Sequence, residues 1–376
     1  MSAPLGDFSP AEFLEQYWQK KPCLIRQAMP GFEPLVDGDD LAGLACEEIS
    51  EARLVSGTME AADWSVEHGP FQEDKFSTLP AENWTLLVQD VEKHYAPLQE
   101  LMQSFQFIPS WRLDDLMISY AVTGGSVGPH TDQYDVFLLQ ATGRRRWQIA
   151  SSFDKELLED CPLNVLKHFS SEQEWILEPG DMLYLPPNIA HHGVALEPGM
   201  TWSIGSRAPS GADLLQGLGE WLAFADDEGG RYADPGLQPA ARAGEIDRQA
   251  LQGLRDLMQA RMDGVELDHY LAAFMSRFRL AHEPVPPPEP VMSGALLTAL
   301  FNGQKLLRNP WTRLAWVETD NGARLYAAGR AYDCDIQLAE ALCGQAQPRI
   351  KLEPMDQSSL DTLTSLVNDG HFLLTN

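Results

Sequence analysis

The pattern of apolar and polar positions changes near Pro209, from short extended segments to helical spacing. Before this point, Pro179-Gly180 marks a tight turn, and the apolar run from Met182 to Leu185 that follows it predicts a short strand. Residues 144–149 also predict a strand, in which every second side chain shares one face. These features predict a β-rich first part of the chain.

Three amphipathic helices are expected after Pro209. Their apolar stripes are Leu214, Leu215, Leu218, Trp221 and Leu222, then Leu251, Leu254, Leu257 and Met258, and then Leu271, Phe274, Met275 and Phe278. Such stripes can cover another domain, or they can pair with the same helices of a second copy in a C2 dimer. Residues 209–282 are therefore expected to form a helical segment with one of these two roles.

A proline-rich stretch, EPVPPPEPV at residues 283–291, predicts a stiff linker before a separate small domain at residues 292–376. In this domain, Asp320-Asn321-Gly322 predicts a hairpin, and IQLAEALCG and SLDTLTSLVNDGHFL predict two helices, the second leading into a final strand. This order is typical of a winged helix. Residues 292–376 hold seven Lys and Arg against nine Asp and Glu, so we expect a protein-contact or structural module without direct DNA binding.

Composition narrows the class of protein and partner. A chain of 376 residues is too long for one ordinary core, so two or three domains are expected. The formal net charge of −28 disfavours nucleic acid and anionic membranes and favours a basic protein partner. Five scattered cysteines without CxxC spacing predict reduced thiols rather than disulfides or a zinc site. With no signal peptide and no run of about 18 apolar residues, we expect a cytoplasmic protein without a membrane segment.

His130 and Asp132 are the first candidate metal ligands. Residues two apart on a strand point to the same face, so the pair offers a nitrogen and a carboxylate oxygen together. A second histidine, His191 or His192, lies about 60 residues further on and would complete the two-histidine, one-carboxylate set of Fe(II) oxygenases. Ligands from two distant strands favour a β-barrel over a zinc finger. The alternative is that His130 and Asp132 form an ordinary surface pair.

Arg145 is the second candidate. Alternation puts it on one face with Trp147 and Ile149, pointing inward, while Arg144 and Arg146 share the other face. An inward arginine needs an anion, and its planar fork fits a carboxylate. That carboxylate is either a buried Asp or Glu of the chain or the distal carboxylate of 2-oxoglutarate.

The segments DDLMISY, GGSVGPHTDQYDVF, GRRRW and PGDMLYLPP, with the histidine that follows, resemble the JmjC ribosomal oxygenases, and most closely the bacterial ribosomal-protein arginine hydroxylases. The resemblance runs from about Phe8 to Pro209 and includes FLEQYWQKKPCLIRQA. It implies a double-stranded β-helix, a jelly-roll barrel of the JmjC and cupin type, over residues 1–208. Beyond this barrel, where the resemblance is weaker, it favours a dimerisation role for residues 209–282.

The resemblance also implies roles for individual residues. Fe(II) would be held by His130, Asp132 and His191, and 2-oxoglutarate, used together with O2, would be anchored by Arg145 with help from Ser119 and with Thr131 beside it. His191 falls on the family's ligand position and shares a face with the small residues Gly193 and Ala195, whereas His192 alternates with Val194 and Leu196. His192 is therefore expected to be a packed or surface histidine.

For the substrate, the resemblance implies contacts from Asp115, Met117, Tyr134 and Ser203. Asp115 shares a strand face with Met117 and Ser119, which suggests a carboxylate aimed at a guanidinium; a surface carboxylate at the strand start is an equal alternative. The expected activity is hydroxylation of an arginyl residue, at the β-carbon, of large-subunit ribosomal protein sixteen. Two other hypotheses remain. The enzyme could be a protein demethylase or could hydroxylate a histidine or asparagine, or the chain could be a non-enzymatic binding protein whose barrel has no catalytic activity.

Overall fold

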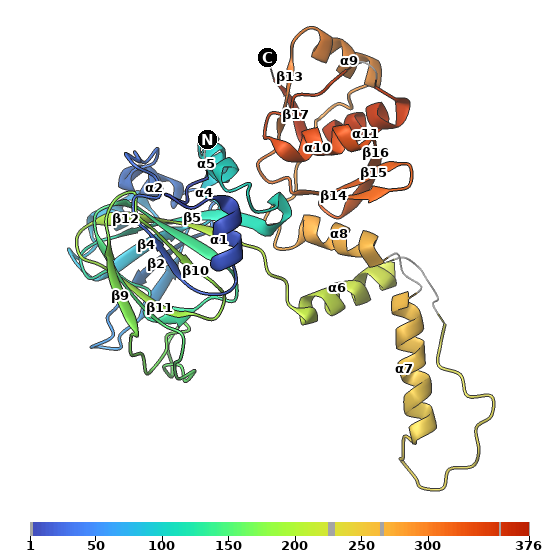
Figure 1. Ribbon diagram of the computed structural model, residues 1–376, viewed down its shortest axis with the longest axis horizontal. Coiled ribbons are helices and arrows are strands. Elements are labelled where there is room, and N and C mark those ends of the chain that lie inside the picture. Colours follow the sequence, from blue (N-terminus) through green and yellow to red (C-terminus); the bar gives the residue numbers. More distant parts are fainter. Residues whose placement is uncertain (1–2, 225–229, 264–266, 353–354, 376) are drawn as a thin grey trace. The chain divides into compact units, whose positions relative to one another are not determined.

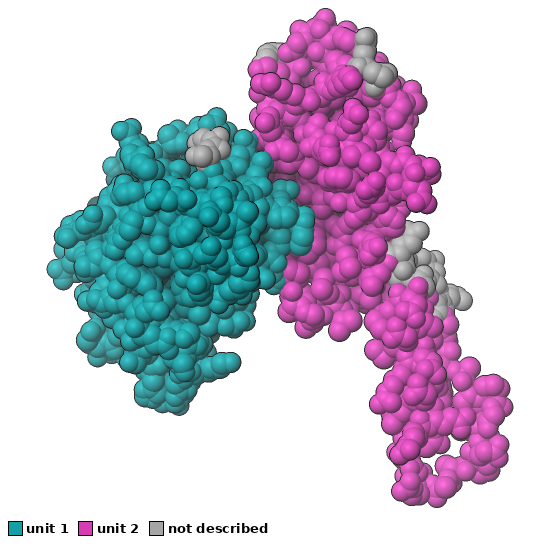
Figure 2. Space-filling view, in the orientation of Figure 1, with its two compact units in different colours: residues 1–208 teal, residues 209–376 magenta. Residues whose placement is uncertain are grey.

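In the computed structural model, the residues described are 3–224, 230–263, 267–352 and 355–375. They form two compact units, Met1–Ala208 and Pro209–Asn376 (Figure 2). The first unit ends where the sequence predicts the end of the barrel.

Two antiparallel sheets make up the first unit (Figure 1). The larger sheet has the strand order β1(Cys23–Ile25), β10(Met182–Leu185), β7(Val136–Thr142), β12(Gly199–Ser206), β5(Leu113–Ala121), β4(Trp84–Val88), β2(Ala52–Ser56) and β3(Ser65–His68). The smaller sheet has the order β6(His130–Thr131), β11(Ala190–Ala195), β8(Arg145–Ala150) and β9(Gln173–Leu177). The predicted strand at Met182–Leu185 is confirmed, and Gly180 in the preceding turn has a φ of 89°, a conformation that favours glycine.

Alternation along the strands of the larger sheet separates a packed outer face from an inner face that lines a cavity. The outer side chains, Ile118, Leu139 and Trp202 among them, pack with residues of the short helices. These are α1(Pro10–Gln16), α2(Gly38–Leu44), α3(Glu73–Ser77), α4(Val91–His94), α5(Leu98–Ser104) and the 3-10 turn Ser110–Arg112. The inner apolar side chains, such as Leu138 and Leu183, pack against Trp147 and Ile149 of the smaller sheet. The two sheets thus form the jelly-roll barrel predicted from the sequence.

The second unit begins with α6(Gly211–Phe224), α7(Arg248–Asp263) and α8(Leu267–Arg277), so all three predicted helices are confirmed. In α6 and α8, Leu218, Tyr270 and Phe274 form a buried cluster. The apolar stripe of α7 stays open to solvent, since Leu254 and Met258 are 39% and 66% exposed. Within the described residues, the apolar face of α7 is only partly covered, with Met262 packed on the cluster of α6 and α8. The expected dimerisation role stays a prediction.

The rest of this unit has the winged-helix order expected from the sequence. Its elements are α9(Ser293–Phe301), β13(Lys305–Arg308), β14(Leu314–Thr319), β15(Gly322–Ala327), β16(Arg330–Cys334), α10(Ile336–Gly344), α11(Gln357–Asn368) and β17(Phe372–Thr375). The hairpin of β14 and β15 turns at Asp320-Asn321, as predicted. The proline-rich residues 283–291 form neither helix nor strand, and the backbone N–H of Val291 donates to Asn368 at 2.7 Å.

Helix α8 packs against this winged-helix region. It contacts β14 and β15, and Ser276 accepts a hydrogen bond from the backbone N–H of Gly329 at 2.9 Å. The separation of residues 209–282 and 292–376 into two domains stays a prediction, since both lie in one compact unit.

No helix in the described parts of the chain is both long and apolar enough to cross a membrane. All five cysteines are free thiols.

Candidate active site

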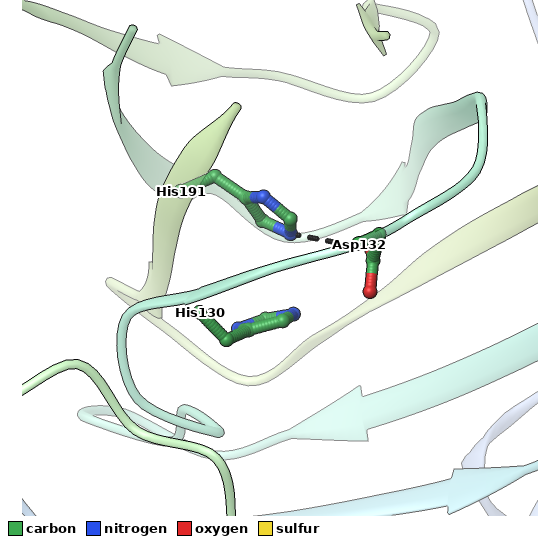
Figure 3. Close-up of side chains that lie close together, drawn as sticks. All are labelled: His130, Asp132 and His191. Carbon is green, nitrogen blue, oxygen red and sulfur yellow. Dashed lines mark ion pairs between the residues drawn. The ribbon is translucent and has the colours of Figure 1, made fainter. Parts of the chain in front are cut away.

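His130, Asp132 and His191 converge inside the barrel (Figure 3). One candidate ligand atom from each of the three residues lies within 4.8 Å of the others. The cluster forms because β6 and β11 pair directly, with His130 opposite His191, while Asp132 follows the end of β6. His191 Nε2 lies 3.6 Å from Asp132 Oδ2. The surface-pair alternative for His130 and Asp132 is therefore not what the structure shows.

Backbone carbonyl groups orient both imidazole rings. His130 Nδ1 donates to the carbonyl of Gly128 at 2.9 Å, and His191 Nδ1 donates to that of Ile189 at 3.0 Å. Because a carbonyl can only accept, each Nδ1 carries the proton and each Nε2 keeps its lone pair for a metal. Burial, with the nearby His130, lowers the pKa of His191 to about 4, so its ring is neutral at pH 7. This donor set fits Fe(II).

His192 lies on the other face of β11. Its ring contacts Phe169 edge-on, with 6.1 Å between ring centroids. Burial, with the charge of Arg145, lowers its pKa to about 4. It is a half-buried packing residue, as the alternation along the strand predicts, and it does not line the cavity.

A cavity of about 310 Å³ between the sheets brings all ten predicted site residues together. They are Asp115, Met117, Ser119, His130, Thr131, Asp132, Tyr134, Arg145, His191 and Ser203. Met117 and Ser119 alternate along β5 with Ile118, which faces the outer core. Ser119 is buried and donates from its hydroxyl to the carbonyl of Thr201 at 3.3 Å.

Arg145 points inward and is only 5% exposed. Its Nη2 donates to the carbonyl of Gly193 at 3.1 Å, and its guanidinium lies 5.1 Å from the ring centroid of Trp147. Its Nε has no hydrogen-bond partner, and no carboxylate of the described residues pairs with it. Burial lowers the pKa of Arg145 to about 10, and the group stays charged at pH 7. An unpaired buried guanidinium fits a bound anion, so the alternative of a buried Asp or Glu partner is not found.

Asp115 is half-buried in the cavity wall rather than being a surface carboxylate. A side chain at Gly205, on the neighbouring strand, would place its Cβ 3.1 Å from Asp115 Oδ1, so glycine leaves room for the carboxylate. Burial, together with Asp114, Glu92 and Asp90, raises the pKa of Asp115 to about 8.

The cavity also contains residues that the sequence did not single out. Arg53 and Thr201 line it from the larger sheet, Gln89 lines it from just after β4, and Leu163 and Asn164 line it from the loop between β8 and β9. Alternation could have indicated Arg53 and Thr201, which share the row of Ser119 across paired strands. Nothing in the local pattern marks Leu163 and Asn164, because their loop has no period.

Comparisons with known proteins agree with this geometry. Residues 100–214 match the JmjC domain, and residues 259–373 match the ROXA-like winged helix. The chain is 36% identical over 372 residues to the ribosomal protein uL16 3-hydroxylase of Escherichia coli, covering 96% of both chains. It is 40% identical over 224 residues to a probable ribosomal oxygenase of Haemophilus influenzae, covering 58% of this chain and 55% of that one.

Solved structures of Escherichia coli YcfD show the same fold. One superposes with a TM-score of 0.88 at 34% identity and covers 100% of both chains. Another, of the ribosomal oxygenase YcfD in complex with cobalt and 2-oxoglutarate, superposes with a TM-score of 0.83 at 35% identity and covers 98% of this chain and 99% of that one. The JmjC match and the His–Asp–His cluster identify Fe(II) and 2-oxoglutarate as the cofactors of this site. From the barrel, the ligand cluster and these similarities, the chain belongs to the JmjC ribosomal oxygenases.

Proposed function

We propose that this chain hydroxylates the β-carbon of an arginyl residue in large-subunit ribosomal protein uL16. The relative of 36% identity is a uL16 3-hydroxylase, and the third carbon of an amino acid is its β-carbon. The observation that carries the choice of arginine is Asp115, a carboxylate in the cavity wall with no hydrogen bond or ion pair to another described residue. Such a carboxylate needs a cation, and a guanidinium offers it two parallel N–H donors.

His130, Asp132 and His191 are the proposed ligands of Fe(II). With 2-oxoglutarate and O2, the bound iron supplies an oxidant able to remove hydrogen from an unactivated carbon, with succinate and CO2 as co-products. The chain's own task is positioning. The carbonyl groups of Gly128 and Ile189 fix the two histidine rings, so the ligand atoms are oriented before the metal binds.

Arg145 is the proposed anchor of the distal carboxylate of 2-oxoglutarate. Its unpartnered Nε, the hydroxyl of Ser119 and Thr131 line the same cavity as the metal ligands. The position of Arg145 depends on Gly193, since a Cβ there would lie 2.7 Å from Arg145 Nε. Gly193 pairs with Trp147 on β8, and its lack of a side chain leaves room for the guanidinium of Arg145.

The substrate arginine is proposed to enter between Asp115, Met117, Tyr134 and Ser203. Met117 and Tyr134 offer apolar surface to the methylene groups, while Asp115 receives the guanidinium. The net charge of −28 favours a basic protein substrate such as a ribosomal protein. The exposed apolar stripe of α7 supports a homodimer through residues 209–282.

The proposal is tested by incubating the holoenzyme with a uL16 peptide that contains a single arginine. We expect a gain of one oxygen at that residue, and Asp115→Asn should reduce peptide turnover by more than it weakens 2-oxoglutarate binding. A peptide with lysine in place of arginine should react poorly, because an ammonium cannot make the two-point contact. Equal hydroxylation of the lysine peptide, together with an unaffected Asp115→Asn variant, would contradict the arginine assignment.

The same experiment separates the other hypotheses. Loss of a methyl group from a methylated peptide would indicate a demethylase, and oxygen on a histidine or asparagine would indicate a different hydroxylase. Absence of succinate with Fe(II), 2-oxoglutarate and peptide would indicate a barrel without catalytic activity.

A further inference from the structure

A buried cluster of charged residues lies behind Asp115, outside the set of residues with a proposed substrate contact. Glu92 and Lys93 come from α4, Asp90 precedes this helix, and Asp114 adjoins Asp115 on β5. The side chains of Lys93 and Glu92 are 6% and 8% exposed, and that of Asp90 is 15% exposed. Burying so many charges is costly, so the cluster calls for an explanation.

Glu92 extends the hydrogen bonding of the sheet where β4 stops. The pairing of β4 with β5 ends at Val88 opposite Ile118, so Leu116 has no β4 residue beside it. Instead, the backbone N–H of Leu116 donates to Glu92 Oε2 at 2.9 Å. Leu116 lies between Asp115 and Met117, so this bond fixes the strand where both side chains enter the cavity.

The cluster holds more acidic than basic groups. Lys93 pairs with Asp90 and lies 3.7 Å from Glu92, and Arg207, just after β12, lies 3.7 Å from Asp114. With Asp115 included, four carboxyl groups share two cations. Of the other residues that line the cavity here, Gln89 is neutral and Arg53 on β2 adds a cation at the wall.

From this geometry we infer that Glu92 and Lys93 are positioning residues for the substrate cation. They hold Asp115 in the cavity wall within an acidic cluster, so that a cationic side chain displaces a proton from Asp115 on binding. This inference rests on the proposed function and deepens it. In the binding step, the protonated carboxyl loses its proton to solvent and the resulting carboxylate pairs with the guanidinium.

The raised pKa values of Asp115, about 8, and of Glu92, about 7, are consistent with this proton exchange. Burial is the largest cause for both residues. Below pH 8, Asp115 is mainly protonated in the free enzyme, and binding of a cation must then release the proton. Affinity for an arginyl peptide should therefore rise with pH through this range.

The test measures affinity for a single-arginine uL16 peptide on both sides of pH 8, using the anaerobic holoenzyme with Fe(II) and 2-oxoglutarate so that no turnover occurs. A plot of affinity against pH should have its midpoint at the pKa of Asp115 in the free enzyme. The dissociation constant of the wild type should increase by up to about tenfold for each pH unit below this midpoint. Calorimetry in buffers with different ionisation enthalpies should detect the released proton. A peptide with citrulline, the neutral isostere of arginine, should show neither effect.

Two variants separate an electrostatic role from a purely structural one. Glu92→Gln keeps an acceptor for Leu116 but removes a negative charge, so the midpoint should move down by roughly 1 pH unit. Lys93→Met removes a positive charge and should move the midpoint up by a similar amount. Structural damage cannot explain shifts of opposite sign. If Glu92→Gln does not fold, Asp90→Asn should give the same downward shift.

Matched controls come from an exposed ion pair elsewhere in the same unit. Lys75 and Glu67 lie 2.7 Å apart with side chains 30% and 55% exposed. Lys75→Met and Glu67→Gln change the net charge as the test variants do, and they should leave the midpoint in place. Shifts of the same sign in both test variants would overturn the inference but not the proposed function. The same holds if neither variant shifts the midpoint while the arginyl peptide is still bound and hydroxylated. Failure to bind the peptide at any pH would contradict the proposed function as well.

Discussion

The doublet His191-His192 shows how a residue's place on a strand decides its chemistry. The two side chains are chemically identical and adjacent, but β11 turns one toward Asp132 and the other toward Phe169. Of these two histidines, only His191 donates from Nδ1 to a backbone carbonyl among the described residues. This hydrogen bond directs its Nε2 toward the ligand cluster. Metal binding should therefore distinguish the two histidines sharply.

Replacing His130, Asp132 or His191 by Ala should abolish Fe(II)-dependent succinate release, because three protein ligands are the full set offered by the cluster. His192→Ala should keep much of the activity, since it loses only packing against Phe169. Metal content after dialysis and succinate release measure the two effects. Loss of iron in His192→Ala with retention in His191→Ala would reverse the assignment.

Arg145 and Arg144 offer a second matched pair. Arg145 is buried and has no carboxylate partner among the described residues. Arg144 instead forms a surface ion pair with Glu197, with side chains 49% and 43% exposed. Arg145→Ala should raise the 2-oxoglutarate concentration needed for half-maximal turnover steeply, as losing one partner of a desolvated charge pair costs roughly 2 to 5 kcal/mol. Arg144→Ala should have little effect, since exposed ion pairs contribute little. Equal effects at both positions would mean that Arg145 does not bind the co-substrate.

At the scale of elements, alternation along strands was the most informative feature of the sequence. It placed Arg145 with Trp147 and Ile149 on the inner face of β8, and it grouped Met117 with Ser119 on β5. Both groups line the interior, because a two-residue period is fixed by the geometry of an extended chain. His130 and Asp132 met the same expectation only in part, since β6 ends at Thr131.

Contacts between distant elements could not be predicted in this way. Glu92 reaches β5 from a helix of four residues, and the spacing of apolar residues in so short a helix carries no signal. Leu163 and Asn164 reach the cavity from an irregular loop. Such contacts depend on where the chain returns in space, which a local pattern does not encode.

The pairing of β11 with β8 provides a prediction at this scale. Gly193 lies opposite Trp147, and a Cβ there would come within 2.7 Å of both Arg145 Nε and the indole ring. Gly193→Ala should force Arg145 to shift, at a cost of about 1 to 3 kcal/mol, and raise the 2-oxoglutarate requirement about tenfold. Gly43→Ala, where nothing lies within 4 Å, is the control. An unchanged requirement in Gly193→Ala would show that the pocket tolerates the displacement.

Asp135 ties several elements of the barrel together and offers a test of stability. Its fully buried carboxylate accepts hydrogen bonds from Tyr184 at 2.6 Å, Gln19 at 3.0 Å and Arg112 at 3.1 Å. Asp135→Ala should lower the free energy of unfolding by about 3 kcal/mol, because three donors lose their acceptor. Chemical denaturation measures the change. Asp7→Ala, at an exposed loop position, serves as the control and should be nearly neutral.

At the scale of the whole molecule, we expect charge to steer the encounter with the proposed basic substrate. The formal net charge of −28 is spread over both units, and the described surface holds many acidic groups without a cation beside them. Such a field attracts a basic protein over distances of about a Debye length, roughly 10 Å at 0.1 M salt. The proposed pair of the buried Arg145 and the carboxylate of 2-oxoglutarate should be far less exposed to screening.

Salt should therefore separate the two binding events. Raising the ionic strength should weaken binding of the proposed basic substrate, uL16, mainly by slowing association, because screening removes the long-range attraction. Binding of 2-oxoglutarate should change much less, since Arg145 is only 5% exposed. Stopped-flow association rates and 2-oxoglutarate titrations at low and high salt measure the two responses. If salt weakened the binding of both ligands equally, the Arg145 contact would lie in solvent. If the association rate of the substrate did not change with salt, the acidic surface would play no part in recognition.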